Sequence, residues 1–246
     1  MSETTAAIGN FDGIHIGHDS IFRKCIEIGN KTGQAKKVIT FEYEFDKFTN
    51  ISKKYKKIYG KHGKIGSLKQ YPLDDIIFFS LDSMTAVMTP EEFVSEILVK
   101  KLSIKNIVVG FNFRFGYKAK GDTKVLNDLS HKYGYQVTII EAVRRNGQII
   151  SSTYIRDLIS KGNLKLANEL LTENYRFDLR DHRMTVLSEN QILLTDNDFV
   201  YPPSGKYLTY IDGKQCELTL DHQQEGLLVE CKALKAPRIV EFLEKI

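Results

Sequence analysis

Residues 9–18 read Gly9-Asn10-Phe11-Asp12-Gly13-Ile14-His15-Ile16-Gly17-His18, and this stretch decides how the first part of the chain is interpreted. It lies between a short apolar run, residues 5–8, and a helical stripe of apolar residues at 21–28. Glycine lets a backbone turn sharply and approach a ligand closely, and the first turn of a helix presents free N–H groups to an anion. The stretch therefore predicts a phosphate-binding turn between a strand and a helix.

The two histidines of this stretch, His15 and His18, form a His-x-Gly-His pattern. Imidazole has a pKa of about 6.5, and anionic phosphates favour its charged form. Two such groups could stabilise charge that grows on phosphoryl oxygens in a transition state. The pattern points to transfer of a nucleotidyl group, although a pair with this spacing can also be structural or bind a metal.

A second polar segment, residues 150–156, reads Ile-Ser-Ser-Thr-Tyr-Ile-Arg. Serine and threonine ahead of an apolar helical stripe are typical of a helix N-cap, and hydroxyls and amides at a helix start also bind phosphate. Arg156 follows Thr153 by about one turn and lies on the same side of the predicted helix. Together with residues 9–18, this segment predicts the second half of an anion clamp.

A third segment, residues 109–116, contains Asn112-Phe113-Arg114-Phe115 and continues to Gly121-Asp122. It follows an apolar strand directly, and ligands of open parallel sheets bind outside the carboxyl ends of the strands. Phenylalanines around an arginine could form the walls of a site for a flat aromatic ring. The alternative is that these aromatic side chains belong to the core at a strand end.

The first two-thirds of the chain alternate β-like runs with helical patterns. Strands are predicted at residues 5–8, 38–41, 76–79, 107–109 and 137–140. Between the third and fourth, Thr89-Pro90-Glu91-Glu92 has the features of a capping box with proline at the first helical position. Such alternation predicts an α/β fold, a Rossmann-like parallel sheet with crossover helices.

The pattern changes near Tyr175, and we expect two domains, residues 1–174 and residues 175–246. Asp212-Gly213 lies between two β-like runs and predicts a hairpin, and residues 227–231 predict a further strand. After Pro237, apolar residues at 239, 242, 243 and 246 have helical spacing. The second domain is therefore predicted to be small and β-rich and to end in a helix.

Composition narrows the class of protein. The chain has 246 residues with a formal charge of +4, from 35 Lys and Arg against 31 Asp and Glu. This excess is too small to indicate a nucleic-acid partner, and no apolar run approaches the roughly 20 residues that span a bilayer. The first residues lack the features of a signal peptide, so we expect a cytoplasmic protein without a membrane partner. The three cysteines predict neither a disulfide framework nor a metal site.

Positive charge is concentrated at residues 47–69, which contain eight lysines and no acidic residue: Lys47, Lys53, Lys54, Lys56, Lys57, Lys61, Lys64 and Lys69. Such a segment can be a solvated loop, or a lid attracted to an anionic substrate. The sequence does not distinguish these two interpretations.

In this order, the motifs resemble those of the bacterial FAD synthetase family, specifically the adenylyltransferase half of the bifunctional riboflavin kinase/FMN adenylyltransferases. The resemblance runs from about Thr5 to Tyr175. The segments that carry it are residues 9–18, Thr40-Phe41-Glu42, residues 90–94, 108–122 and 151–171. The Asn112-Phe113-Arg114-Phe115-Gly116 block separates this family from related nucleotidylyltransferases.

The resemblance implies that the phosphate of FMN attacks the α-phosphorus of ATP, giving FAD and pyrophosphate, with Mg²⁺ accompanying the ATP phosphates. It implies a catalytic role for His15, His18 and Arg156. The ATP-binding residues that it implies are Gly9, Asn10, Phe11, Asp12, Gly13, Gly17, Ser151, Ser152 and Thr153. The flavin-binding residues that it implies are Phe41, Asn112, Phe113, Arg114, Phe115 and Asp122. No metal ligand or oligomeric state is implied.

The sequence departs from the family pattern in two places. The family usually continues Thr-Phe-Glu with a Pro-His-Pro-like segment, where this chain has Tyr43-Glu44-Phe45. The motifs of the kinase half are missing after Tyr175, so residues 175–246 resemble a shortened remnant and imply no riboflavin kinase activity. The alternatives are a flavin- or nucleotide-binding regulatory protein with weak or lost catalysis, and an adenylyltransferase for another phosphate monoester, such as a pantetheine or nicotinamide nucleotide.

Overall fold

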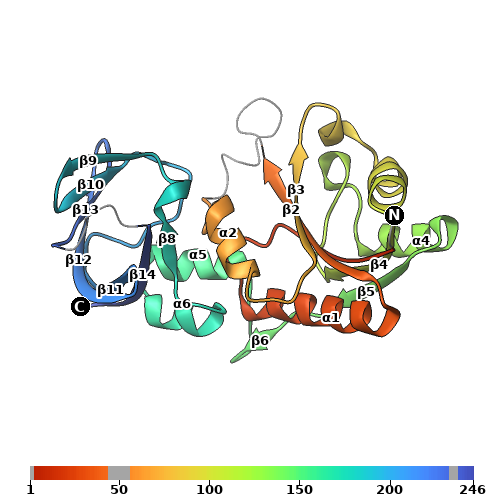
Figure 1. Ribbon diagram of the computed structural model, residues 1–246, viewed down its shortest axis with the longest axis horizontal. Helices are drawn as coiled ribbons and strands as arrows, with labels where there is room; N and C mark the ends of the chain where they lie inside the picture. Colours follow the sequence, from red (N-terminus) through yellow and green to blue (C-terminus); the bar gives the residue numbers. More distant parts are fainter. Residues whose placement is uncertain (1–2, 44–55, 233–237) are drawn as a thin grey trace. The chain divides into compact units, whose positions relative to one another are not determined.

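The computed structural model describes residues 3–43, 56–232 and 238–246. The chain forms two compact units (Figure 1). The first unit comprises residues 1–11, 17–52 and 68–144, and the second comprises residues 12–16, 53–67 and 145–246. Tyr175 is fully buried inside the second unit. The division between residues 174 and 175, expected from the change of sequence pattern near Tyr175, remains a proposal.

The first unit is built on a five-stranded parallel sheet with the order β3-β2-β1-β4-β5. Its strands are β1 (Thr4–Ile8), β2 (Ala35–Tyr43), β3 (Asp75–Leu81), β4 (Ile104–Gly110) and β5 (Gln136–Ile140). All five predicted strands are present, and the predicted Rossmann-like class is confirmed. Strand β1 precedes the first motif, residues 9–18, and β4 leads into the third motif, residues 109–116. These two strands are neighbours at the centre of the sheet.

Helices cover both faces of this sheet (Figure 1). On one face, Ile8, Ile39 and Val109 pack in a core with Leu98 and with Leu126 of helix α4 (Thr123–Tyr133). Helix α1 (Ile16–Thr32) packs on the other face, where the buried Cys25 thiol lies 3.6 Å from the Thr5 carbonyl oxygen. Alternate residues of the central strands β1 and β4 thus pack on opposite faces, which explains why most residues of both strands are buried.

The helix predicted after Thr89 begins as expected. The Thr89 hydroxyl accepts from the Glu92 N–H, and the Glu92 carboxylate accepts from the Thr89 N–H, so both halves of the capping box are present. After α3 (Pro90–Glu92), the helix continues as a π-helix over Phe93–Lys101. At its end, the Leu102 N–H donates to the carbonyl of Ile97, five residues earlier.

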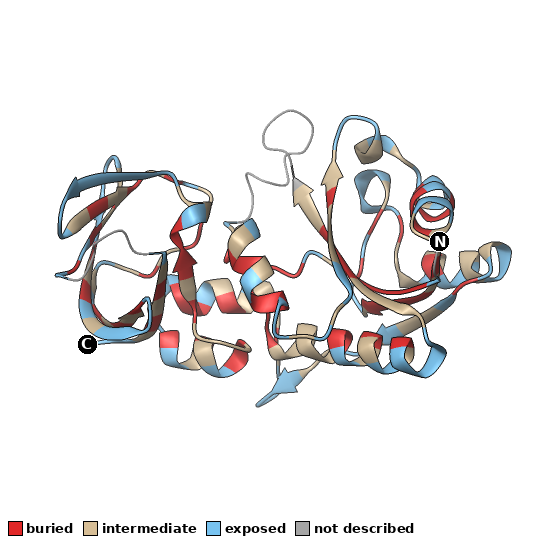
Figure 2. Ribbon diagram, in the orientation of Figure 1, coloured by how far each residue is buried: buried red, intermediate tan, exposed pale blue. Residues whose placement is uncertain are grey.

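The second unit contains a seven-stranded antiparallel sheet with the order β8-β14-β11-β12-β13-β10-β9. The strands are β8 (Arg176–Asp178), β9 (Met184–Ser188), β10 (Gln191–Leu194), β11 (Gly205–Ile211), β12 (Lys214–Gln223), β13 (Gly226–Glu230) and β14 (Ile239–Lys245). The predicted hairpin forms β11 and β12, with Asp212 and Gly213 at positive φ in its turn. Figure 2 shows a buried core along these strands and an exposed β9.

Helices α5 (Ser152–Ser160) and α6 (Leu164–Leu170) belong to the second unit, and α5 is the helix predicted after Ser151. A two-stranded hairpin of β6 (Arg144–Arg145) and β7 (Gln148–Ile149) precedes them. No helix in the described parts of the chain is long and apolar enough to cross a membrane. Cys25, Cys216 and Cys231 all lie in the described parts of the chain, and none of them forms a disulfide.

The closing helix predicted after Pro237 is wrong, because residues 239–245 form strand β14. Val240 and Phe242 are fully buried, and the residues between and beside them are less buried, as expected for alternation along a strand. β14 pairs with β11 and with β8. The helical spacing of 239, 242, 243 and 246 was misleading because pairing with two neighbouring strands outweighs a short apolar pattern.

The lysine-rich segment is described only from residue 56 onward. Helix α2 (Lys61–Leu68) occupies much of this part, and Lys64 is buried. Residues 56–69 therefore do not form an open, solvated loop. Lys47, Lys53 and Lys54 lie outside the described residues, as do Glu44 and Phe45 of the altered motif. Whether the segment acts as a lid remains a prediction.

Two glycines with similar positive φ allow a test of close backbone packing. Gly134 (φ 68°) has open space where a Cβ would lie, whereas a Cβ on Gly116 (φ 70°, ψ 178°) would lie 2.8 Å from the Pro90 nitrogen. We expect Gly134→Ala to lower the free energy of unfolding by about 1 kcal/mol. Gly116→Ala should cost about 2 kcal/mol more, because its ψ is nearly glycine-only and the Pro90 backbone must move. Urea unfolding measures both, and equal losses would contradict this packing.

Candidate active site

The middle of the first motif, residues 12–16, lies in the second unit and is held there by the start of α5 and the end of α6. The Ser152 hydroxyl donates to the Asp12 carbonyl at 2.6 Å. His15 forms an isolated antiparallel bridge with Leu171, and the Thr172 N–H donates to the Ile14 carbonyl at 2.9 Å. The first and second predicted motifs are thus directly bonded to each other.

The Asp12 carboxylate is buried and has several donors. Oδ1 accepts from the N–H groups of Ile58 and Tyr59, each at 3.0 Å. Oδ2 accepts from Arg156 Nη1 at 2.9 Å, in an ion pair whose side chains are 6% exposed for Asp12 and 17% for Arg156. A charged pair this far from water depends on such additional hydrogen bonds, because they offset the desolvation of both charges. Asp12 thereby fixes where Arg156 lies.

Helix α5 begins with the predicted N-cap. The Ser151 hydroxyl accepts from the Tyr154 N–H at 3.3 Å. Arg156 Nη2 donates to the Thr153 hydroxyl at 3.3 Å, which confirms that the two residues share one side of the helix. The guanidinium is therefore held between Asp12 and the first turn of α5, and the same turn presents hydroxyls beside it. This arrangement suits an anion, because cation, hydroxyls and helix N-terminus lie together.

His15 is 5% exposed, and burial lowers its pKa from 6.5 to about 4. The ring is therefore neutral at neutral pH in the protein without ligand. The sequence analysis expected the charged form to be favoured by phosphate. A bound anion would favour the charged form of His15 and so oppose the desolvation that suppresses its charge.

The two ends of the first motif belong to the first unit. Phe11 adopts a positive φ of 47° and is 2% exposed, and its ring packs edge-on against His18 at 5.2 Å between centroids. A Cβ on Gly9 would lie 2.9 Å from this ring, so glycine is required there. The Asn10 carbonyl accepts from the Thr40 hydroxyl at 2.9 Å. Phe11 is thus a core residue that supports the turn and the start of α1, which includes Gly17.

The third motif follows β4 in the first unit. Phe113 and Phe115 are buried, and their rings stack with centroids 5.5 Å apart. Phe115 also packs against Phe93, and Phe41 packs against Phe93 and Phe79. Phe113 and Phe115 are therefore core residues, as the alternative interpretation expected, and their contact with a flavin remains a prediction.

The polar members of the third motif are exposed. Asn112 and Arg114 alternate with the buried phenylalanines, and Arg114 Nη1 lies 3.4 Å from Asp122 Oδ2. Asp122 also caps α4 by accepting from the Val125 N–H at 3.0 Å. The loop is closed by two hydrogen bonds between Phe115 and Gly121. The loop leaves Asn112 and Arg114 exposed. The predicted flavin-binding group remains a prediction: Phe41, Asn112, Phe113, Arg114, Phe115 and Asp122.

Sequence reasoning missed the part that residues 57–63 play in the second unit. Ile58 and Tyr59 contribute backbone N–H groups to Asp12, and no side-chain pattern signals such a role. The only sequence signal in this region was its lysine content. Gly13 packs closely against this segment, because a Cβ there would lie 2.6 Å from the Ile58 side chain.

Comparison with known proteins agrees with this geometry. The fold is that of a Rossmann-like nucleotidylyltransferase. The family model described as FAD synthetase matches residues 1–154, and the chain belongs to this family. A relative named FAD synthetase, from Listeria monocytogenes, is 32% identical over 203 residues, which cover 82% of this chain and 79% of the relative.

Other similar proteins are longer. The bifunctional riboflavin kinase/FMN adenylyltransferase of Buchnera aphidicola is 35% identical over 170 residues, 69% of this chain and 54% of that protein. The chain thus matches about half the length of such relatives. A crystal structure described as a macrolide-efflux protein from Streptococcus pneumoniae covers all of this chain and 86% of its own, with a TM-score of 0.78 and 24% identity. It shows that the whole chain shares one known fold.

The buried His15 predicts a pH dependence of stability. Its pKa is about 4 in the folded protein and about 6.5 when unfolded. The unfolded chain therefore binds the extra proton between these values, and stability falls as pH decreases through this window, by up to about 3 kcal/mol. His15→Asn should reduce this loss when unfolding is compared at pH 7.5 and 4.5.

The exposed His131 of α4 provides the control for replacing a histidine as such. If His15→Asn and His131→Asn changed the pH dependence equally, burial of His15 would not be its cause.

Proposed function

We propose that the protein is an FMN adenylyltransferase. A phosphate oxygen of FMN attacks the α-phosphorus of ATP, the bond to the β-phosphate breaks, and FAD and pyrophosphate leave. This reaction requires positioning and charge stabilisation rather than a covalent nucleophile. Membership of the FAD synthetase family supports the choice of FMN as the acceptor.

The observation that carries the proposal is the position of Arg156. Its guanidinium is bonded to Asp12 and Thr153, and Ser152 is bonded to the Asp12 carbonyl. These contacts place a fixed cation, two hydroxyl-bearing residues and a helix start at one point. Arg156, Ser152 and Thr153 would hold the triphosphate there, and Ser151 supports them as the cap. Asp12 would act through Arg156 rather than touch ATP itself.

The remaining roles follow from the motifs. His15 and His18 would stabilise charge that develops on the phosphoryl oxygens. Gly9, Asn10, Gly13 and Gly17 would shape the turn that receives ATP. On the flavin side, Asn112 and Arg114 offer exposed polar groups shortly after β4, and Asp122 pairs with Arg114. Phe41, Phe113 and Phe115 would contribute aromatic surface.

Magnesium is proposed to enter with ATP and to neutralise phosphate charge when bound. The carboxylate nearest to Arg156, that of Asp12, does not suit a metal ligand, because two N–H groups and a guanidinium already bond it. Across the described residues, no group of three or more His, Cys, Asp and Glu side chains could hold a metal ion. No step is therefore assigned to a protein-bound metal.

The C-terminal region, residues 175–246, is proposed to lack riboflavin kinase activity, since the kinase motifs are missing from its sequence. The substrates are then ATP and FMN, and a cytoplasmic location without nucleic-acid or membrane partners fits this role.

The function is tested by two incubations, with MgATP and FMN and with MgATP and riboflavin. We expect FAD and pyrophosphate from the first and no FMN from the second, measured by chromatography and pyrophosphate release. Flavin binding without FAD under oxidising and reducing conditions would instead indicate a regulatory protein. Adenylyl transfer to another phosphate monoester at a rate equal to or above that for FMN would indicate a different acceptor.

A second prediction concerns His18. His18→Ala should lower the turnover number of FAD formation by at least about a hundredfold, because the ring stabilises the transition state, while FMN affinity changes little. Stopped-flow kinetics and flavin fluorescence titration measure the two effects. Equal losses of turnover and affinity would mean that the ring only shapes the pocket beside Phe11.

A further inference from the structure

The second unit contains a chain of polar contacts that leads from the C-terminal region to Arg156. Its central element is the segment formed by residues 57–63, which runs into helix α2. Each end of this segment is held by a buried carboxylate. Asp12 accepts from the N–H groups at one end, and Asp181 accepts from those at the other.

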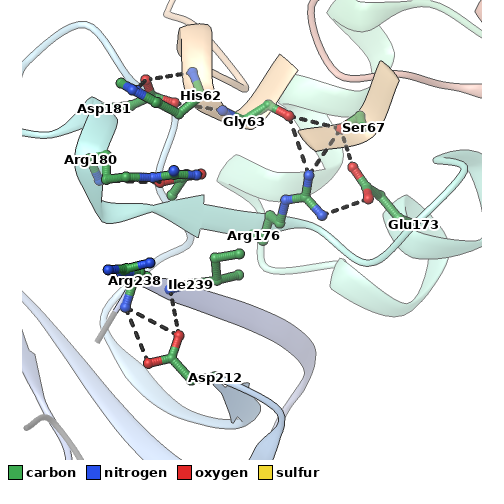
Figure 3. Close-up of polar contacts among 11 residues, drawn as sticks. His62, Gly63, Ser67, Glu173, Arg176, Arg180, Asp181, Asp212, Arg238 and Ile239 are labelled. Atoms are coloured by element: carbon green, nitrogen blue, oxygen red, sulfur yellow. Dashed lines mark hydrogen bonds and ion pairs between the residues drawn. The ribbon is translucent and has the colours of Figure 1, made fainter. Parts of the chain in front are cut away.

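Asp181 lies just after β8 and bonds the start of α2 (Figure 3). Its Oδ1 accepts from the His62 N–H at 2.9 Å, and its Oδ2 accepts from the Gly63 N–H at 2.8 Å. The Asp181 side chain is only 6% exposed. A carboxylate at a helix start satisfies N–H groups that have no partner within the helix and interacts favourably with the helix dipole. A Cβ on Gly60 would lie 2.4 Å from the Asp181 carboxyl carbon, so the fit is close.

Lys57, the first residue of the segment, attaches it to the C-terminal region. Its N–H donates to the Asp198 carbonyl at 2.6 Å, and its carbonyl accepts from the Val200 N–H at 2.8 Å. Its Nζ forms an ion pair with Asp198 at 2.9 Å. The backbone of Lys57 thus runs alongside residues 198–200 as an added piece of strand, next to the two N–H groups that bond Asp12.

A third set of contacts holds the body of α2. Arg176 of β8 donates to the Gly63 carbonyl and to the Ser67 hydroxyl, each at 3.3 Å, and pairs with Glu173 at 2.6 Å (Figure 3). Ser67 also donates to Glu173. Burial raises the pKa of Glu173, and Arg176 opposes that shift. The segment is therefore held by the C-terminal region at its start, at its end and along the helix that follows.

We propose that the C-terminal region positions Arg156 for adenylyl transfer, with Asp181 and Asp198 as positioning residues that act through residues 57–63 and Asp12. Asp12 keeps Arg156 in one place only while the N–H groups of Ile58 and Tyr59 remain fixed. If they move, the carboxylate loses two of its donors, and the guanidinium is free to shift. This inference rests on the proposed function, and it assigns the region a role that requires no kinase chemistry.

Asp181→Asn tests the proposal, with Asp178→Asn as the matched control. Asp178, the last residue of β8, is also a buried carboxylate and lies three residues before Asp181, but it bonds Arg180 rather than residues 57–63. We expect Asp181→Asn to lower kcat for FAD formation about tenfold to a hundredfold, because small displacements of a positioning group are costly. KM for FMN should stay near the wild-type value. Asp178→Asn should retain wild-type kcat, and equal losses in both variants would overturn the proposal.

A double-mutant cycle with Arg156→Lys separates positioning from general destabilisation. If Asp181 acts through Arg156, then Asp181→Asn should cause little further loss of kcat in the Arg156→Lys background. Fully multiplicative losses would mean that Asp181 affects the reaction independently of Arg156. If Asp181→Asn does not fold, Asp198→Asn replaces it in the cycle, because it removes only a partly exposed ion pair.

A readout without activity distinguishes failure of this proposal from failure of the proposed function. Amide hydrogen exchange at Ile58 and Tyr59 should become at least several-fold faster in Asp181→Asn and stay unchanged in Asp178→Asn. If the wild-type protein makes no FAD but the exchange pattern is as expected, the proposed function is refuted and the connection between Asp181 and Asp12 is supported. Unchanged exchange in Asp181→Asn would refute the connection itself.

Discussion

The ion pair between Asp12 and Arg156 is the interaction on which the second unit's part of the site depends. Burying a carboxylate is costly unless its oxygens are satisfied, and here two backbone N–H groups and one guanidinium satisfy them. The same requirement fixes three segments that are distant in the sequence: residues 12–16, residues 57–63 and the first turn of α5. Loss of any one of these partners would remove part of the compensation for the buried charge.

This constraint also holds residues 57–63 of the lysine-rich segment in place. Residues 57–63 donate N–H groups to two buried carboxylates, Asp12 and Asp181, and neither interaction uses a lysine ammonium group. The basic character of the segment and its structural role are therefore separate properties. The positive charge of the segment can attract anions over a distance. Its structural role is to set the position of Arg156, the cation nearest to the proposed triphosphate site.

The sequence predicted much of the fold. The five parallel strands, the capped helix after Thr89 and the β11–β12 hairpin all have strong local signals, in apolar runs, capping residues and a turn dipeptide. The closing helix failed because β14 is defined by its partners β8 and β11 and not by its own periodicity. For the site, the sequence indicated Ser152, Thr153 and Arg156, but it could not indicate that Asp12 serves Arg156, since the bonding of a carboxylate depends on what folding brings to it.

By itself, the sequence determined the fold class and the family, because strand and helix periodicity and an ordered set of motifs are local properties of the chain. The tertiary structure decided which groups meet. It made Phe11, Phe113 and Phe115 parts of cores, removed His15 from water so that its pKa falls, and connected Asp181 through residues 57–63 to Asp12. These outcomes depend on burial and on backbone N–H groups. Every residue except proline carries such a group, so the residue types in the sequence could not predict them.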